Sequence, residues 1–254
     1  MLFRSIAVLA AANILNNKVA PRLGPLTSTA ATAALVAMAR KSGLSWQEIG
    51  FEHGRRGAIA GGALAAAVAV VYTAGIASAR TRPLFHDERA LSLSRARVLE
   101  EALLQVPLGT VLLEEVGFRG ALYAMMRRRH GTVAATAVSS TLFGLWHILP
   151  AIDMARANPA LGALTAGESP GHLATARVVA GSVVSTAAAG VFFCELRRRR
   201  GLLTPSMLHL ATNSFGYLFA RLAAKRAHVS TTTAHTSATP GRPSVTSEQP
   251  SATG

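Results

Sequence analysis

The chain has 254 residues, of which 50% are hydrophobic and only 15% are charged. This balance excludes an ordinary soluble domain and is typical of a helical protein that crosses a membrane several times. The formal net charge of +14 would suit a nucleic-acid-binding protein. The arginines, however, gather in clusters between apolar runs (127–129 and 197–200 among them), as in loops that stay on the cytoplasmic side and contact anionic lipids. We therefore expect membrane lipids as partners and no nucleic acid, with an acidic partner as the alternative.

Seven segments are candidate membrane spans, and together they predict an all-α fold, a polytopic transmembrane helical bundle of about six to eight spans. They cover about residues 3–20, 26–40, 57–79, 99–126, 131–150, 174–195 and 202–223. The runs 57–79 and 131–149 contain no Asp, Glu, Lys or Arg, over a length that crosses a bilayer core. The first two segments are weak because they are short or interrupted by polar residues. The segment 3–20 has Arg4 before its apolar core and so resembles a signal peptide superficially, but it fits a transmembrane helix better than a cleaved leader.

The polar stretches between these segments divide the chain. Residues 41–56 suit an interfacial helix or turn, 80–98 a polar connection, and 150–173 a loop on the far side that is punctuated by Pro and Gly. The tail is rich in Thr, Ser and Pro, has almost no large apolar residues and is expected to be disordered. The resulting division is N-terminal transmembrane helices with an interfacial segment (1–97), a transmembrane core (98–223) and a disordered C-terminal tail (224–254).

Two adjacent glutamates lie in the middle of the fourth segment. Arg119 follows Glu115 by four residues. Charges buried in a membrane-length helix are costly, so such residues usually mark function. On an α-helix Glu115 and Arg119 share one face, one turn apart, while Glu114 points about 100° away. The spacing predicts an ion pair between Glu115 and Arg119 and leaves Glu114 available as a general acid or base. The alternative is a structural network in which both glutamates hold helices together.

Two further polar pairs lie on later segments. Phe143 and His147 are four residues apart in the fifth, and His209 and Asn213 are four residues apart in the seventh. Each pair shares one helix face. A lone histidine such as His147 is more often a hydrogen-bonded structural residue, and hydrogen bonds between helices would equally explain the second pair. As functional groups, these side chains could bind a metal, a water molecule or a developing oxyanion.

Taken in order, the patterns Glu-Glu-x-x-x-Arg, Phe-x-x-x-His and His-x-x-x-Asn resemble the CPBP family, the CAAX proteases and bacteriocin-processing enzymes of the membrane. This family includes proteins of the abortive-infection and type 2 CAAX prenyl protease kind. The resemblance covers about residues 98–220 and implies an intramembrane endopeptidase. The implied roles are activation of the attacking water by Glu114 and His147, stabilisation of the oxyanion by His209 and Asn213, orientation of the site by Glu115 and Arg119, and lining of the pocket by Phe143.

The same resemblance bears on the cofactor, because the family is commonly described as metal-dependent. It implies zinc or another divalent metal, for which Glu114, His147 and His209 would be three ligands beside an open position. The sequence has no His-Glu-x-x-His motif. None of the three patterns contains a serine or cysteine, which disfavours a covalent intermediate. The expected partner is a protein or peptide substrate at the membrane, and the expected location is a bacterial plasma membrane.

Two other functions stay open. A non-catalytic membrane scaffold or bacteriocin-immunity-type protein would use the same polar network for structure, and it would tolerate Glu114→Gln. A small proton-coupled transporter would also carry carboxylates and histidines at membrane depth. Transporters often contain inverted repeats, and no such symmetry is apparent in this sequence.

Overall fold

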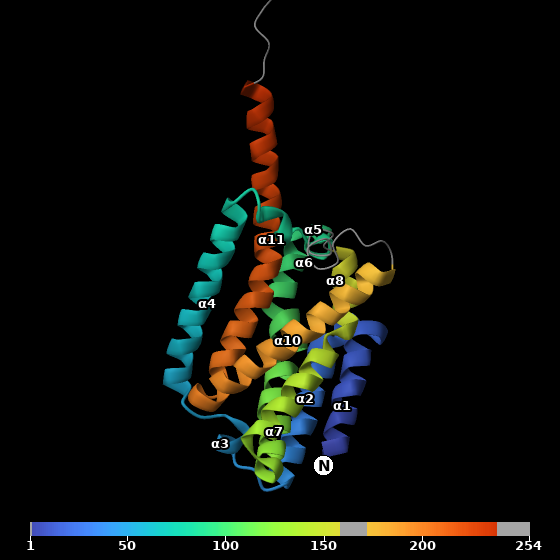
Figure 1. Cartoon of the computed structure of the whole chain (residues 1–254), viewed down its shortest axis with the longest axis vertical. Helices are drawn as coiled ribbons and strands as arrows, with labels where there is room; N and C mark the ends of the chain where they lie inside the picture. Colours follow the sequence, from blue (N-terminus) through green and yellow to red (C-terminus); the bar gives the residue numbers. More distant parts are fainter. Residues whose placement is uncertain (1, 158–171, 238–254) are drawn as a thin grey trace, which may run out of the picture.

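The computed structural model describes residues 2–157 and 172–237. Within these ranges every regular element is a helix, which confirms the predicted all-α bundle (Figure 1). The elements in chain order are α1 (Leu2–Ile14), η1 (Leu15–Val19), η2 (Pro21–Leu23), α2 (Gly24–Lys41), α3 (Trp46–Ile49), α4 (Gly54–Ala77), η3 (Arg82–Phe85), α5 (Glu88–Leu91), α6 (Arg95–Glu100), η4 (Glu101–Val111), η5 (Leu113–Leu122), α7 (Tyr123–Trp146), α8 (Ile148–Ala157), α10 (His172–Arg200) and α11 (Leu203–Ser237).

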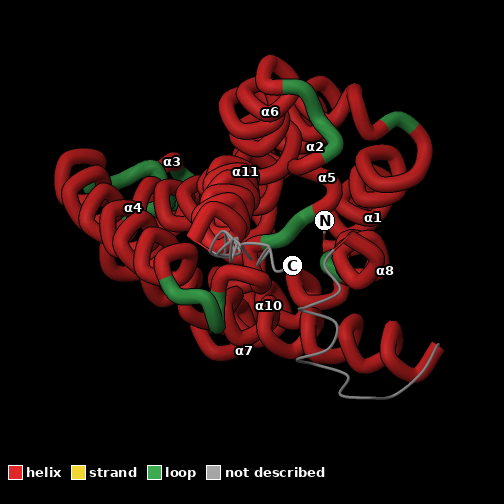
Figure 2. The backbone as a smooth tube through the Cα atoms, turned by 90° about the horizontal axis from the view of Figure 1, so that it is seen from above, coloured by secondary structure: helices red, strands yellow, loops and turns green. Residues whose placement is uncertain are grey.

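The glutamate-bearing stretch η4–η5 lies in the interior of the bundle. All ten residues of η5 are buried, because α2 and α7 pack against this segment while α11 packs against η4. Figure 2, which looks down the bundle, shows α11 beside α4 and α10 beside α7, and in both pairs the two helices pack against one another. The predicted transmembrane core is therefore enclosed by helices from both the N-terminal and the C-terminal parts of the chain.

The helix that carries the glutamates differs from the α-helix expected from the sequence. Both η4 and η5 are π-helical, with i→i+5 hydrogen bonds and more residues per turn. Pro107 lies inside η4, where it lacks an N–H group and cannot continue the α-helical ladder. π-Helical turns are rare and are often found at functional sites.

A sharp reversal at Gly131 brings the second predicted motif to the first. Gly131 has a φ of 78°, in the left-handed region that glycine adopts without strain. The part of α7 that follows packs back against η5. Ser139 donates a hydrogen bond to the carbonyl oxygen of Phe118 (3.1 Å), and the end of the helix lies beside Glu114. The expected break between segments 99–126 and 131–150 is thus an antiparallel hairpin.

All seven predicted segments are helical, but fewer meet a test of length and hydropathy for a membrane span. In the described part of the chain, two helices pass it, Trp46–Ala77 and Thr175–Arg200. The pair Arg95–Trp146 and Ile148–Ala157, bent by 42°, is a third if it counts as one broken span. Some predicted segments fail this test because their helices are short: α1 has only 13 residues, and an α-helix needs about 20 to cross a bilayer core.

Two predicted boundaries are wrong. The far-side loop was expected over 150–173, yet residues 150–157 belong to α8; Pro150 is tolerated because it lies in the first turn of that helix. The disordered tail was expected from residue 224, yet α11 continues to Ser237. The remaining parts of both predictions, 158–171 and 238–254, lie outside the described residues.

Candidate active site

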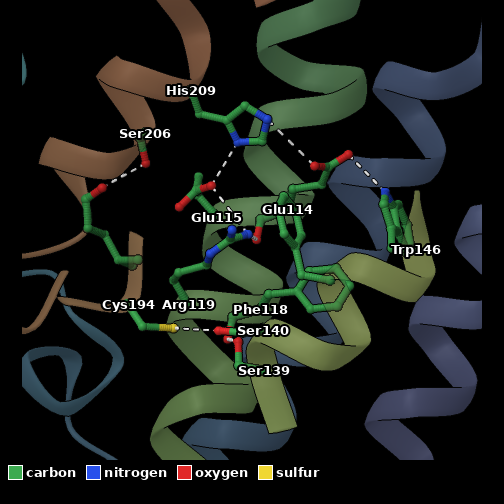
Figure 3. Close-up of polar contacts among 12 residues, drawn as sticks. Glu114, Glu115, Phe118, Arg119, Ser139, Ser140, Trp146, Cys194, Ser206 and His209 are labelled. Atoms are coloured by element: carbon green, nitrogen blue, oxygen red, sulfur yellow. Dashed lines mark hydrogen bonds and ion pairs between the residues drawn. The ribbon is translucent and has the colours of Figure 1, made fainter. Parts of the chain in front are cut away.

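The three sequence motifs meet at one place in the bundle. Glu114, Glu115 and Arg119 come from η5, and His209 projects toward both carboxylates from α11 (Figure 3). The end of α7 supplies His147. The side chains of Glu115 and Arg119 are fully buried, and that of Glu114 is 5% exposed. Burying this many ionisable groups is costly unless they pair with one another, so the pairing pattern is informative.

The two oxygens of Glu114 have different surroundings. Oε1 accepts a hydrogen bond of 2.9 Å from the indole Nε1 of Trp146. Oε2 is buried and has no hydrogen-bond partner among the described residues. It lies 3.9 Å from Nε2 of His147 and 3.6 Å from Nε2 of His209. One oxygen is therefore held in place, while the other faces two imidazole rings.

Glu115 is the paired carboxylate, as the spacing predicted, but its closest partner is a different residue. Its Oε1 lies 3.4 Å from Nη1 of Arg119 and only 2.7 Å from Nδ1 of His209. Sequence reasoning grouped His209 with Asn213 and did not find this contact. A carboxylate beside Nδ1 orients the ring and directs its Nε2 toward Glu114, so Glu115 joins η5 to α11.

Arg119 is held by the rings of Phe143 and Phe193 and by one carbonyl oxygen in addition to Glu115. Its guanidinium carbon lies 3.6 Å from the ring centre of Phe143, and Nη1 donates a hydrogen bond to the backbone oxygen of Glu114 (3.2 Å). The predicted pocket-lining residue Phe143 is buried and serves as this platform. Its edge also contacts His147, with ring centres 4.5 Å apart. Phe143 thus connects the ion pair to the second motif.

The orientation of His147 follows from one hydrogen bond. Its Nδ1 lies 2.8 Å from the backbone oxygen of Phe143. A carbonyl oxygen only accepts, so Nδ1 carries the proton. In the neutral ring Nε2 is then unprotonated and directs its lone pair toward Glu114. The His147 side chain is 20% exposed, more than any of the three charged residues around it.

Asn213 is the predicted site residue that the structure does not tie to the others. It lies one turn after His209 on α11 and is partly buried. Within the described ranges no hydrogen bond involves its amide. Its assignment to the oxyanion site stays a prediction.

Sequence reasoning missed two residues that support the site. Trp146 is not a defining residue of any of the three motifs, yet its indole N–H donates a hydrogen bond to Glu114. Arg197 belongs to an arginine cluster expected in a loop, yet its side chain is buried. Its Nε donates to the backbone oxygen of Arg119 (3.0 Å), and its guanidinium lies over the ring of Tyr123. Adjacency to His147 was the available signal for Trp146; nothing in the local sequence distinguishes Arg197 from its neighbours.

The predicted metal ligands are close together but are not arranged as a metal site. No group of three or more His, Cys, Asp or Glu side chains among the described residues could hold a metal ion. The separations of 3.6 and 3.9 Å between Glu114 and the two histidines exceed the roughly 3.4 Å between ligands that share one tetrahedral zinc ion with bonds of about 2.1 Å. No observation here supports a zinc site, so the zinc assignment stays a prediction, and the chemistry below uses side chains alone.

Comparison with known proteins agrees with the motifs. Residues 101–215 match the protein family described as type II CAAX prenyl endopeptidase Rce1-like. Searches of the curated proteins and of the solved structures gave no match. The matched range contains all seven residues of the three motifs, and it begins and ends within the helices that position them. Over this range, which is less than half of the chain, the sequence is similar to the Rce1-like type II CAAX prenyl endopeptidases.

Proposed function

We propose that this protein is an intramembrane endopeptidase that hydrolyses peptide bonds of membrane-associated substrates by direct attack of water. The observation that carries the proposal is the free oxygen of Glu114. It is buried, lacks a hydrogen-bond partner and faces Nε2 of His147 at 3.9 Å. Two acceptors cannot form a hydrogen bond with each other, but one water molecule between them could donate a hydrogen bond to each.

The proposed first step is removal of a proton from this water by Glu114, with His147 accepting the second hydrogen bond of the water and aligning it. The resulting hydroxide attacks the carbonyl carbon of the peptide bond. Negative charge then develops on the carbonyl oxygen, where preorganised donors have their largest effect. We assign this role to the amide of Asn213 and to His209 as an imidazolium, in which Nδ1 donates to Glu115 at 2.7 Å and Nε2 donates to the oxyanion. The proton held by Glu114 passes to the departing amine.

Glu115 and Arg119 have a supporting role in this proposal. Their ion pair orients His209 and fixes the backbone beside Glu114. The implied partners are membrane lipids and a protein or peptide substrate at the membrane, and the implied location is a bacterial plasma membrane. A prenyl group on the substrate is not required by any of these contacts.

The decisive experiment compares protein termini in membranes of cells that carry the wild-type protein, Glu114→Gln or Glu100→Gln. Glu100 is a matched control because it precedes the same π-helical stretch and pairs with Arg97 instead of the site. Equal expression of all three forms is confirmed first. We expect new termini with the wild type and Glu100→Gln and none with Glu114→Gln. Identical termini in all three, with any cellular role retained by Glu114→Gln, would refute proteolysis and favour the membrane scaffold.

A further inference from the structure

The Glu114 carboxylate is held from one side by a neutral aromatic donor. We infer that Trp146 is a positioning residue for the general base, because its indole N–H binds one oxygen of Glu114 and thereby directs the other toward His147 and His209. This inference rests on the proposed function, since it explains how the proposed base is aligned. Trp146 occupies the last unspecified position of the Phe-x-x-x-His motif and is not one of its defining residues.

The geometry of the carboxylate is the first support. Oε1 accepts from Trp146 Nε1 at 2.9 Å, a distance within the normal range of a hydrogen bond. Oε2 has no hydrogen-bond partner and is the oxygen nearest both imidazoles. Figure 3 shows the indole and His209 on opposite sides of the Glu114 carboxylate. Rotation of the carboxylate would break the indole bond, so Trp146 determines which oxygen faces the site.

The second support is that Trp146 is itself fixed by three elements. It is the last residue of α7, before the chain bends into α8. Its ring packs edge-on against Phe118 of η5, with centres 5.4 Å apart and planes at 80°. Its backbone oxygen accepts a hydrogen bond of 3.0 Å from the amide of Asn13 in α1. The N-terminal region therefore contributes to the alignment of the base through this residue.

The chemistry of the indole is the third support. An indole N–H only donates and does not titrate, so it binds the carboxylate without adding a charge. A lysine or arginine at this place would pair with Glu114, as Arg119 does with Glu115. The two adjacent glutamates thus differ in function by their partners: Glu115 is joined to cationic or titratable groups, and Glu114 is held by a neutral one. A base must keep its negative charge available for the proton that it removes.

The test removes the N–H group and keeps the ring. Trp146→Phe retains an aromatic side chain against Phe118, and Trp46→Phe is the matched control. Trp46 is the other tryptophan of the chain, lies on α3 and is 52% exposed. We expect Trp146→Phe to lower kcat roughly 10- to 100-fold with KM changed less than about twofold, and Trp46→Phe to change neither. An unchanged kcat in Trp146→Phe would overturn the inference.

A second measurement separates positioning from general structural damage. The isostere of tryptophan in which sulfur replaces the N–H keeps the size and packing of the ring. With this residue at position 146, we expect the same loss of kcat and an unchanged melting temperature. Full activity of the isostere would show that only the packing of the ring matters, which would overturn the inference.

A readout that does not use activity distinguishes this inference from the proposed function. In the Trp46→Phe background, the ¹⁵N-labelled protein in detergent micelles has one indole N–H resonance, that of Trp146. We expect Glu114→Gln to shift it and Glu100→Gln to leave it in place. If the resonance shifts but the wild type cleaves nothing, the contact stands and the hydrolysis is refuted. If Glu114→Gln leaves the resonance unmoved, the positioning role is refuted even in an active enzyme.

Discussion

The ion pair between Glu115 and Arg119 offers the sharpest energetic prediction. Both side chains are fully buried, and Glu115 Oε1 and Arg119 Nη1 are 3.4 Å apart. Unit charges at this distance attract one another by about 5 kcal/mol at an effective dielectric constant of about 20. Removal of one partner also leaves the other charge buried and uncompensated, which typically costs about 3–5 kcal/mol. We expect Arg119→Met to lower the free energy of unfolding by an amount in that range.

A double-mutant cycle measures the pair itself. The free energies of unfolding of wild type, Glu115→Gln, Arg119→Met and the double variant are compared by reversible detergent titration. We expect the double variant to be more stable than the sum of the single losses predicts, with a coupling energy of about 2–5 kcal/mol. We expect this coupling because each single variant leaves one buried charge without its partner, whereas the double variant removes both charges.

The control is the pair Arg128–Glu48, whose Nη2 and Oε1 are only 2.6 Å apart but whose side chains are 42% and 41% exposed. Exposed pairs are screened by water and many contribute nothing measurable, so its cycle should give no coupling outside experimental error. If distance alone set the strength of an ion pair, the exposed pair would be the stronger of the two. Additive losses for Glu115 and Arg119, or a coupling no larger than that of the exposed pair, would refute the reasoning that burial makes this pair strong.

Three further predictions concern packing, the oxyanion and the metal. Gly144→Ala should destabilise the protein by about 1–3 kcal/mol, because a Cβ there would lie 2.6 Å from the backbone oxygen of Val183. The control is Gly181→Ala, whose Cβ meets nothing within 4 Å and which should be neutral or slightly stabilising. Equal melting temperatures of the two variants would contradict this packing. Asn213→Ala should lower kcat by roughly 100-fold at an unchanged melting temperature, because no described hydrogen bond uses its amide; an unchanged kcat would exclude it from the oxyanion site. Elemental analysis of the purified protein should find no stoichiometric divalent metal, given the spacing of the three side chains; one metal per chain, lost in His147→Ala, would restore the zinc prediction.

Local patterns along the sequence were sufficient for the fold class and for the location of the motifs. Long runs without charge predict helices because no other regular structure satisfies the backbone of a single apolar segment in a membrane. The break near residues 127–131 was evident from three arginines followed by a glycine. The pairing of Glu115 with Arg119 was also predictable, because residues four apart on one helix are neighbours wherever the helix lies.

The sequence left the helix type and the ends of two elements undetermined. The π-helical geometry of η4 and η5 is not encoded in residue propensities. The helix α8 was not expected because Pro and Gly in this stretch favour a loop, and the composition of the tail did not indicate that α11 continues to Ser237.

The tertiary structure alone decided which groups touch. His209 and Glu115 are separated by 94 positions and Trp146 and Glu114 by 32, so their contacts depend on how far each helix is rotated and displaced along its axis. A motif read along one helix determines which residues share a face, but not which face meets another helix or at what depth. The sequence by itself determined an all-helical membrane protein with three polar motifs, and packing decided that one oxygen of Glu114 lacks a hydrogen-bond partner and that His209 pairs with Glu115.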